Sequence, residues 1–250
     1  MRKFGLIGFP LGHSFSKIYF AEKFLKENIS DCCYENFQLP DLDQIHKLIT
    51  QETDLCGLNV TIPYKSDIIR YLDVIDPEAV EIGAVNVLKI KRMPGQIKLY
   101  GYNSDVTGIR DSLEPFIKDD VKNAIIFGTG GSSRAVYYVL RRYGLNITLI
   151  SRNRKPGILE YSDINPGLIH KTDLIINTTP LGMFPSINTR PDINYALLSK
   201  KHILFDLVYN PEFTSFLKMG IERGCSVISG TKMLHSQAEK AWEIWNDEGL

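Results

Sequence analysis

Two kinds of hydrophobic pattern alternate along this chain. Short apolar runs typical of strands are followed by longer segments in which apolar residues recur at helical spacing. Strands that alternate with helices in this way are typical of an α/β fold with mostly parallel sheets. In the first part of the chain the pattern predicts strands at 4–8, 34–39 and 56–60, helices at 14–26, 41–51, 66–72 and 77–81, and a hairpin around Pro94-Gly95.

The same alternation starts again after Asp105. A helical stretch leads to a strand at 124–127, a glycine-rich turn and a helix that runs to about residue 143. Later strands are predicted in "NITLISR", "DLIINTTP", "ILFDLVY" and "CSVIS", and an amphipathic closing helix in "TKMLHSQAEKAWEIWN". Because the last strand ends at Gly230, this helix is expected to return to the first of two α/β domains, with a cleft between them. The predicted domains are residues 1–105 together with 231–250, and residues 106–230.

Composition and charge exclude several classes of function. The chain has 250 residues, 44% of them hydrophobic and 23% charged, with a formal net charge of zero, as in ordinary soluble globular proteins. No basic block supports nucleic-acid binding, and no segment is apolar enough to span a membrane. The start, "MRKFGLIGFP", is too short and too glycine-rich to be a signal peptide. The four cysteines form no CxxC pair, which indicates neither a metal site nor disulfides and favours a cytoplasmic location.

A glycine-rich turn is the first candidate for ligand binding. Gly128, Gly130 and Gly131 follow an apolar strand and open a helix. In a dinucleotide fingerprint such glycines let the backbone approach the pyrophosphate, whose charge the helix N-terminus attracts. The sixth position is Ser133, which is small, and the alternative is a tight turn without a ligand. The pattern favours a Rossmann-like dinucleotide-binding domain over residues 106–230.

The end of the next strand indicates which dinucleotide binds. NAD sites usually carry an acidic residue there, which accepts hydrogen bonds from the ribose hydroxyls. This chain instead has Ser151, Arg152, Asn153 and Arg154. A guanidinium can pair with a 2′-phosphate, whereas a carboxylate would repel it. The sequence therefore favours NADP(H), although both arginines could also be solvated loop charges.

The stretch "GLNVTIPYK" is the candidate catalytic segment. It places Asn59, Thr61 and Lys65 at the end of a strand, where open α/β sheets bind ligands. Asp105 follows the later strand in "KLYGYN". A lysine that exchanges a proton with a reacting oxygen, oriented by an aspartate, would suit the oxidation of an alcohol. The alternative for Lys65, taken alone, is an ordinary solvated surface lysine.

These segments and several others together resemble one known family, the shikimate dehydrogenases, and the resemblance runs nearly from end to end. Eight motifs carry it in order. They are "GFPLGHSFS" (8–16), "GLNVTIPYK" (57–65), "IGAVNV" (82–87), "GYNSDVTG" (101–108), "FGTGGSSRA" (127–135), "INTTPLGM" (176–183), "DLVYNP" (206–211) and "GTKMLHSQA" (230–238). The resemblance implies reversible, NADPH-dependent reduction of 3-dehydroshikimate to shikimate in aromatic amino-acid (chorismate) synthesis, without a metal ion.

The resemblance also implies a role for each matching position. Lys65 and Asp105 would form the catalytic pair, and Ser14 and Ser16 would hold the substrate carboxylate. The ring hydroxyls would be bound by Asn59, Thr61, Asn86 and Gln237, with Tyr209 nearby. The cofactor would contact Gly128, Gly130, Gly131, Ser132, Ser151, Arg152, Thr178, Met183 and Gly230.

The chain departs from the family pattern in several places. Lys17 replaces a proline, and Tyr19-Phe20 replaces a His-Asn pair, so the first helix begins differently and carries a charge near the carboxylate position. Ser104 replaces a threonine, and Ser151 replaces an asparagine that contacts the adenosine. The largest departure lies between Arg154 and the strand in "DLIINTT". Two Pro-Gly signals in this short segment predict a loop or a single helical turn rather than a full helix.

Several alternatives stay open at this level. Ser14 could instead cap a helix, Tyr209 could anchor a strand end, and Met183 could be simple packing. The enzyme could be a quinate or quinate/shikimate dehydrogenase that uses NAD, or a ligand sensor without catalysis. The intact Lys65 and Asp105 positions argue against a sensor. The only partner expected besides NADP(H) is the small substrate, for a chain that acts as a monomer or homodimer.

Overall fold

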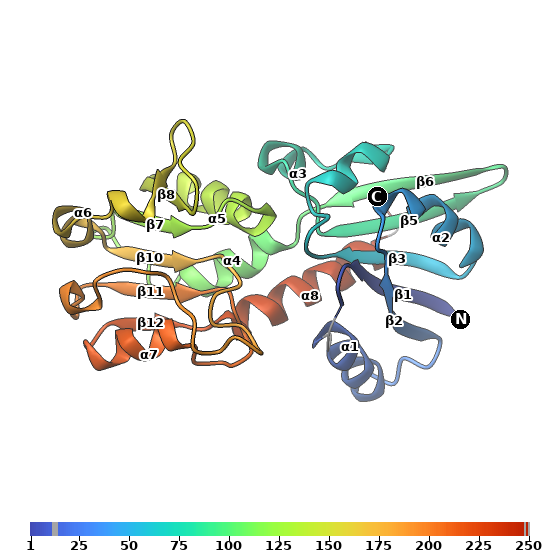
Figure 1. The fold of residues 1–250 in the computed structure, drawn as a ribbon. Helices are drawn as coiled ribbons and strands as arrows, with labels where there is room; N and C mark the ends of the chain where they lie inside the picture. Colours follow the sequence, from blue (N-terminus) through green and yellow to red (C-terminus); the bar gives the residue numbers. More distant parts are fainter. Residues whose placement is uncertain (12–14, 248, 250) are drawn as a thin grey trace. The chain divides into compact units, whose positions relative to one another are not determined.

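The computed structural model describes residues 1–11, 15–247 and 249 as two compact units (Figure 1). The first unit consists of Met1–Ser104 and Ala238–Leu250, and the second of Asp105–Gln237. Each unit has its own six-stranded sheet. The chain leaves the first unit after Ser104 and re-enters it within the closing helix α8 (Gly230–Asn246).

The first unit contains a mixed sheet with the strand order β2-β1-β3-β5-β6-β4. Strand β1 pairs in parallel with β2 and β3, whereas β5 runs antiparallel to β3 and to its hairpin partner β6. Strand β4, which pairs in parallel with β6, was not predicted. Its two residues are too few to show the alternation of apolar and polar residues that marks a strand. The strands are β1 (Arg2–Gly8), β2 (Cys32–Gln38), β3 (Leu55–Val60), β4 (Val74–Ile75), β5 (Val87–Met93) and β6 (Gln96–Tyr102).

Local signals set the helices of this unit. Helix α3 (Pro77–Ile82) starts where the Asp76 carboxylate accepts hydrogen bonds from backbone N–H groups, and it ends at Gly83, whose φ of 69° is left-handed. The prediction of one helix over 41–51 needs correction, because a 3₁₀ turn η1 (Leu42–Gln44) precedes α2 (Ile45–Gln51). The segment predicted at 66–72 is likewise a 3₁₀ helix, η2 (Asp67–Tyr71). Helix α1 spans Phe15–Lys26.

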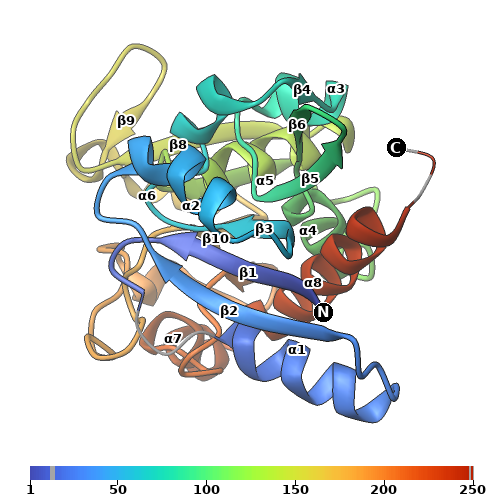
Figure 2. The ribbon, with the colours of Figure 1, turned by 90° about the vertical axis from the view of Figure 1, so that its right-hand side faces the viewer.

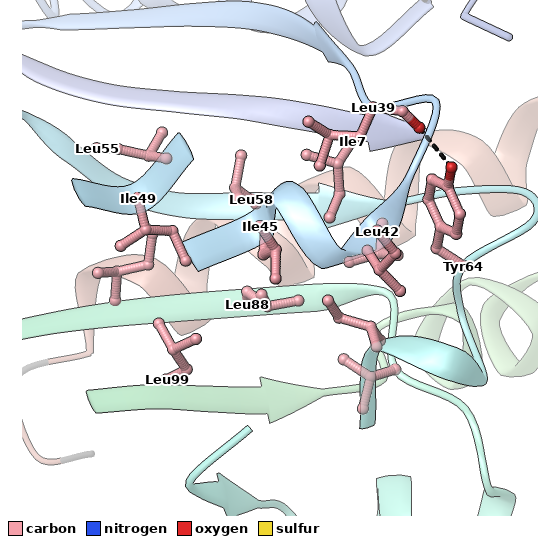
Figure 3. Packing of buried hydrophobic residues seen from close by; sticks show 14 of the residues in the cluster. Ile7, Leu39, Leu42, Ile45, Ile49, Leu55, Leu58, Tyr64, Leu88 and Leu99 are labelled. Atoms are coloured by element: carbon pink, nitrogen blue, oxygen red, sulfur yellow. Dashed lines mark hydrogen bonds between the residues drawn. The ribbon is translucent and has the colours of Figure 1, made fainter. Parts of the chain in front are cut away.

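Apolar side chains cover both faces of this sheet. On strand β1, Ile7 belongs to the cluster beneath α2 and η2, whereas Phe4 and Leu6 belong to the cluster beneath α1 and α8. This alternation is the period of two that a strand imposes on its side chains. Figure 2 shows α1 and α2 on opposite sides of strands β1 and β2. Figure 3 shows the α2 cluster, where Leu58 and Leu88 of adjacent strands pack against Ile45.

The second unit contains a fully parallel sheet with the strand order β12-β11-β10-β7-β8-β9, the arrangement expected of a Rossmann-like unit. In the middle of the sheet, all residues of β10 and β11 and all but the first residue of β7 are buried, as is usual for parallel strands covered on both faces. The strands are β7 (Asn123–Phe127), β8 (Asn146–Ser151), β9 (Leu159–Glu160), β10 (Leu174–Asn177), β11 (Ile203–Asp206) and β12 (Ser226–Ile228). The α-helices are α4 (Asp105–Leu113), α5 (Gly131–Arg142), α6 (Pro166–Lys171), α7 (Ser215–Glu222) and the first part of α8.

The segment after Arg154 is more ordered than the prediction of a loop or a single helical turn. It adds the edge strand β9, a 3₁₀ turn η3 (Tyr161–Asp163) and the six-residue helix α6. The second Pro-Gly pair was misjudged as a helix breaker. Pro166 occupies the first turn of α6, where its missing N–H costs nothing, and the Asn165 side chain caps the helix by accepting from the Leu168 N–H at 3.0 Å. No full-length helix forms, as predicted.

Candidate active site

Two buried asparagines form the centre of the candidate substrate site in the first unit. Asn59 on β3 accepts a hydrogen bond from the Tyr34 hydroxyl at 2.8 Å and donates to the Asn86 carbonyl at 3.4 Å. The Asn86 amide donates to the Ser104 hydroxyl at 3.1 Å and accepts from the Ser104 N–H at 2.7 Å. These bonds hold the ends of β3 and β6 and the segment before β5 together. Ser104 therefore makes these bonds at the position where a threonine was expected.

The turn that carries Lys65 is anchored at several points. Its main chain is tied to β1 by the Thr61 N–H, which donates to the Ile7 carbonyl at 2.9 Å. The buried Tyr64 ring packs into the core and its hydroxyl donates to the Leu39 carbonyl (Figure 3). The Lys65 carbonyl accepts from the Val85 N–H at 2.7 Å, while the side chain is partly exposed. These hydrogen bonds thus fix the position of the Lys65 Cα, from which the side chain extends.

Asp105 is the first residue of helix α4, directly after Ser104, and its side chain is only 3% exposed. By its contacts Lys65 belongs to the first unit and Asp105 begins the second. The catalytic pairing of these two residues therefore stays a prediction. What the structure adds is that both side chains start from backbone that hydrogen bonds hold in place, since Ser104 is bonded to Asn86 on one side of Asp105.

Tyr34 is a site residue that the sequence did not reveal. Its hydroxyl donates to Asn59, its ring stacks on Phe20 at 4.6 Å between centroids, and it hydrogen-bonds to Ser16. Burial raises the pKa of the Tyr34 phenol, and the hydrogen bond with Ser16 opposes that increase. Tyr34 thus links two positions expected to bind substrate. No motif marks it, because it lies in strand β2, far from both partners in the sequence.

The departures near the first helix have simple structural outcomes. The Lys17 ammonium pairs with the Glu35 carboxylate at 2.6 Å, so its charge is compensated by an acidic neighbour. Phe20 is fully buried in the core beneath α1 and α8. Ser16 lies in the first turn of α1. Ser14, the other residue expected to bind the substrate carboxylate, lies outside the residues that the structure describes.

The glycine turn of the second unit has the backbone that a pyrophosphate requires. Gly128 has a φ of 108°, and a Cβ there would lie 2.5 Å from the Thr178 hydroxyl. Gly130 is the N-cap of the twelve-residue helix α5 and, as a glycine, has no side chain that could cap it. A Cβ on Gly130 would meet nothing within 4 Å, so the space beside the helix N-terminus is open. A phosphate fits there, where helix N–H groups and the helix dipole favour negative charge.

Three hydroxyls around this turn bond to the protein's own backbone. Ser133 donates to the Gly128 carbonyl at 2.7 Å, and Thr178 donates to the Phe127 carbonyl at 2.5 Å. Ser151 donates to the Asn153 carbonyl at 2.6 Å. These bonds shape the turn and the end of strand β8. A cofactor contact of Thr178 or Ser151 stays a prediction.

The two arginines after strand β8 differ in their surroundings. Arg152 is exposed, and it makes no ion pair or hydrogen bond with any residue that the structure describes. Arg154 forms an ion pair with Asp163, and Glu160 lies 3.7 Å away. Arg152 is therefore the arginine of this pair that is available to a 2′-phosphate.

The other predicted positions lie in loops of the second unit and on helix α8. Met183 is 42% exposed in the loop after β10. Burial raises the pKa of the partly exposed Tyr209 phenol after β11. A Cβ on Gly230 would lie 2.4 Å from the Leu207 carbonyl, so only glycine allows α8 to start this close to the loop after β11. The Gln237 amide donates to the Leu234 carbonyl at 3.0 Å.

Asp206, fully buried at the end of β11, connects two loops of the second unit. One carboxylate oxygen accepts from the Asn177 amide and from the Val208 N–H, both at 3.0 Å. The other accepts from the Thr214 hydroxyl at 2.5 Å. Asn177 also donates to the Leu181 carbonyl, so the carboxylate holds the loop after β10 against the loop after β11. Only its place in the "DLVYNP" motif could have drawn attention to this residue.

The environment of Asp206 predicts a pH-dependent stability. Burial raises the pKa of its carboxyl from 3.8 to about 7, against the opposing effect of its three donors. Between these values the unfolded chain releases a proton that the folded chain keeps. Rising pH therefore stabilises the unfolded state, and stability falls across this window by at most about 1.4 kcal/mol per pH unit from this group.

An Asp206→Asn variant cannot ionise and keeps an acceptor for Asn177. We expect its free energy of unfolding, measured by urea denaturation, to fall less steeply between about pH 4 and pH 7 than that of the wild type. The matched comparison is Asp192→Asn, which removes a carboxylate from an exposed position of the same unit. Parallel curves for wild type and Asp206→Asn would contradict the expectation.

Within the described part of the chain, no group of three or more His, Cys, Asp or Glu side chains could hold a metal ion. Nor does any helix among these residues combine the length and apolar character needed to cross a membrane.

Comparison with known proteins agrees with this geometry. A family model described as the shikimate dehydrogenase substrate binding domain matches residues 6–88. An NADP⁺ shikimate dehydrogenase of Methanococcus aeolicus is 38% identical over 96% of this chain and 90% of its own length. That of Clostridium beijerinckii is also 38% identical, over 99% and 93%. The crystal structure of shikimate 5-dehydrogenase from Thermus thermophilus, in complex with NADP(H) and shikimate, is 28% identical, covers 100% of this chain and 94% of its own, and has a TM-score of 0.84.

A substrate-binding α/β unit followed by a Rossmann-like unit with a glycine turn defines the class, an NADP-dependent oxidoreductase. Within that class, the chain belongs to the shikimate dehydrogenase family.

Proposed function

We propose that this protein catalyses the reversible, NADPH-dependent reduction of 3-dehydroshikimate to shikimate, a step of aromatic amino-acid synthesis. The observation that best supports the proposal is the network of Asn59, Asn86 and Ser104 beside the anchored Lys65 turn. Its amide and hydroxyl groups are of the kind that can bind the hydroxyls of a polyhydroxylated ring. The relatives named NADP⁺ shikimate dehydrogenases match nearly the whole chain.

The proposed chemistry assigns a proton to Lys65. The nicotinamide supplies a hydride to the C3 carbonyl carbon when NADPH is bound. The Lys65 ammonium donates its proton to the oxygen as negative charge develops there, and Asp105 orients the ammonium. In the reverse direction neutral Lys65 accepts the proton from the C3 hydroxyl. A positioned acid of this kind typically accelerates a reaction by about 10²–10⁴-fold.

The remaining residues hold the two ligands. In the proposal, Ser14 and Ser16 bind the substrate carboxylate. Asn59, Thr61, Asn86 and Gln237 bind the ring hydroxyls, with Tyr209 beside them. The pyrophosphate lies at Gly128, Gly130, Gly131 and Ser132. Arg152 and Ser151 bind the adenosine end, and Thr178, Met183 and Gly230 line the nicotinamide position.

The two units divide these tasks. In the proposal, residues 1–105 with the returning helix bind the substrate, and residues 106–230 bind NADP(H). We further propose that the enzyme works as a monomer or homodimer in the cytoplasm, where its four free cysteines would stay reduced.

A spectrophotometric assay tests the proposed reaction. Purified protein is mixed with 3-dehydroshikimate and NADPH, and the loss of reduced nicotinamide is followed. A parallel reaction replaces NADPH by NADH. Further reactions run in the oxidative direction, with shikimate or quinate as substrate and NADP⁺ or NAD⁺ as cofactor. Turnover of 3-dehydroshikimate with NADPH supports the proposal. The proposal would be contradicted if folded protein turned over quinate but neither 3-dehydroshikimate nor shikimate, or if it turned over none of the three.

The bridge through Tyr34 leads to a further prediction about substrate affinity. Tyr34→Phe keeps the ring stacked on Phe20 but removes the hydroxyl that bonds to Asn59 and Ser16. Losing one to two hydrogen bonds that orient binding residues should raise the KM for shikimate about three- to tenfold. Because the proposal gives this hydroxyl no part in the proton transfer, kcat should change less than about twofold.

The matched control is Tyr102→Phe, which removes a buried phenol of the same core cluster. Steady-state kinetics with shikimate and NADP⁺ should leave its KM unchanged. Two results for Tyr34→Phe would show that Tyr34 does not position Asn59 and Ser16 for binding. One is an unchanged KM, and the other is a fold decrease in kcat as large as the fold increase in KM.

A further inference from the structure

The short segment after strand β8 brings two carboxylates to the adenosine end of the second unit. Strand β9 pairs in parallel with β8, and this register sets Glu160 directly beside Ser151. Asp163 follows in the 3₁₀ turn η3, where one of its oxygens accepts from the Glu160 N–H at 2.9 Å. The segment is thus tied to itself by a reciprocal cap, which fixes both carboxylates relative to the end of β8.

These carboxylates engage one of the two arginines. The Arg154 guanidinium donates to the second oxygen of Asp163 and lies 3.7 Å from the Glu160 carboxylate. Glu160 also accepts from the Ser162 hydroxyl at 2.8 Å, which orients it. Arg152, two residues earlier, is exposed and makes no comparable contact with described residues. The two arginines therefore differ in how readily they can turn toward a new anion.

The position of these groups matters because of where the adenosine ribose lies in this fold. In Rossmann-like units the ribose lies at the end of the strand that follows the glycine-turn helix, here β8. A carboxylate there accepts hydrogen bonds from a free 2′-hydroxyl and repels a 2′-phosphate, whereas a guanidinium binds the phosphate. This chain has both kinds of group, an available Arg152 and a carboxylate at Glu160.

We propose that Asp163 and Glu160 limit the preference of this enzyme for NADP over NAD by pairing with Arg154, so that Arg152 alone recognises the 2′-phosphate. The inference rests on the proposed cofactor site but not on the proposed substrate. The two carboxylates lower affinity for the 2′-phosphate in two ways, because Asp163 engages a second guanidinium and Glu160 places a negative charge beside Ser151. Both residues are specificity determinants at the cofactor's adenosine end.

The test measures binding of cofactor fragments, which reach only the adenosine end. Isothermal titration calorimetry gives the Kd of adenosine 2′,5′-bisphosphate, which carries the 2′-phosphate, and of 5′-AMP, which lacks it. Asp163→Asn keeps an oxygen acceptor for the Glu160 N–H but loses the charge that holds Arg154. Its Kd for the bisphosphate should fall about three- to tenfold, with 5′-AMP changed less than about twofold, since a charge-assisted hydrogen bond to phosphate is gained.

Three further variants show whether the gain acts through Arg154. Arg154→Gln alone should leave the bisphosphate Kd within about twofold, because this guanidinium is already engaged, and Asp163→Asn should give no gain in the Arg154→Gln background. Arg152→Gln should weaken bisphosphate binding at least about tenfold. Glu160→Gln should tighten bisphosphate binding without tightening 5′-AMP. Thermal melts compare the folding of all variants.

Several outcomes would overturn the inference. One is an equal gain for Asp163→Asn with and without Arg154, and another is a large loss of bisphosphate affinity in Arg154→Gln. An unchanged Kd in both Asp163→Asn and Glu160→Gln, with melting temperatures intact, would make the carboxylates purely structural. Failure of the proposed reaction is seen separately, as absent turnover of 3-dehydroshikimate by protein that still discriminates the two fragments.

Discussion

Replacing Lys65 with alanine should lower kcat for shikimate oxidation by about 10²–10⁴-fold, the usual contribution of a positioned acid or base. The substrate's hydroxyl contacts in the proposal come from Asn59, Asn86 and their neighbours, which the change leaves in place. The Kd for shikimate, measured by calorimetry, should therefore rise only a few-fold. The turn itself should stay folded, because the alanine variant keeps the hydrogen bonds of the Tyr64 hydroxyl and of the residue 65 carbonyl.

Two variants make this result specific. Lys47→Ala removes an exposed lysine on helix α2 and should leave kcat unchanged. Lys65→Arg keeps the charge, but its guanidinium stays protonated at any working pH and cannot exchange a proton, so kcat should fall nearly as far as in the alanine variant. Unchanged turnover in Lys65→Ala would remove this residue from the chemistry. Full activity in Lys65→Arg would show that Lys65 contributes a positive charge but transfers no proton.

The second large effect is expected on stability, from Trp245→Ala on helix α8. The indole is 6% exposed, stacks on Phe4 at 4.8 Å between centroids and donates to the Leu88 carbonyl at 2.9 Å. It also fills the space over Gly57, where even a Cβ would come within 2.3 Å of it. Truncation should lower the free energy of unfolding of the first unit by about 3–5 kcal/mol, through lost burial, a cavity and an unpaired carbonyl.

Urea denaturation followed by circular dichroism measures this effect. The matched control is Trp242→Ala, one turn earlier on α8. Trp242 is only partly buried and meets Phe4 edge-on at 5.4 Å, and its truncation should cost about 1 kcal/mol. An equal decrease in the free energy of unfolding in the two variants would mean that the specific contacts of Trp245 add nothing beyond the burial of a large side chain on α8. A negligible loss in Trp245→Ala would mean that this end of α8 does not stabilise the first unit.

Much of the fold followed from patterns within a few residues of each position. The alternation that sends Phe4 and Ile7 to different clusters has a period of two, which is visible in the sequence of a single strand. The failures were local conflicts between signals. The Pro166-Gly167 pair predicts a helix break, but Asn165 before it makes Pro166 the start of a helix. The segment predicted as a helix at 66–72 forms a 3₁₀ helix instead.

The candidate site divides in a similar way. Lys65, Asn59 and Asn86 each lie in a contiguous motif, so their positions could be named from the sequence. The function of Tyr34 could not, because its two partners come from a helix and a strand that are distant along the chain. In the sequence, Asp206 is marked only by its place in the "DLVYNP" motif. Its role depends on three donors from loops that become neighbours when strands β10 and β11 pair.

The main alternation of strands and helices, the glycine turn of the cofactor unit and the positions of the motifs could be predicted from the sequence alone, because these depend on local spacing and side-chain type. Two further features depend on the folded chain: Tyr34 bridges Ser16 and Asn59, and Arg154 pairs with Asp163 while Arg152 does not. Such partners depend on strand order and register, here the pairing of Ser151 with Glu160, and register is fixed by packing of the whole sheet.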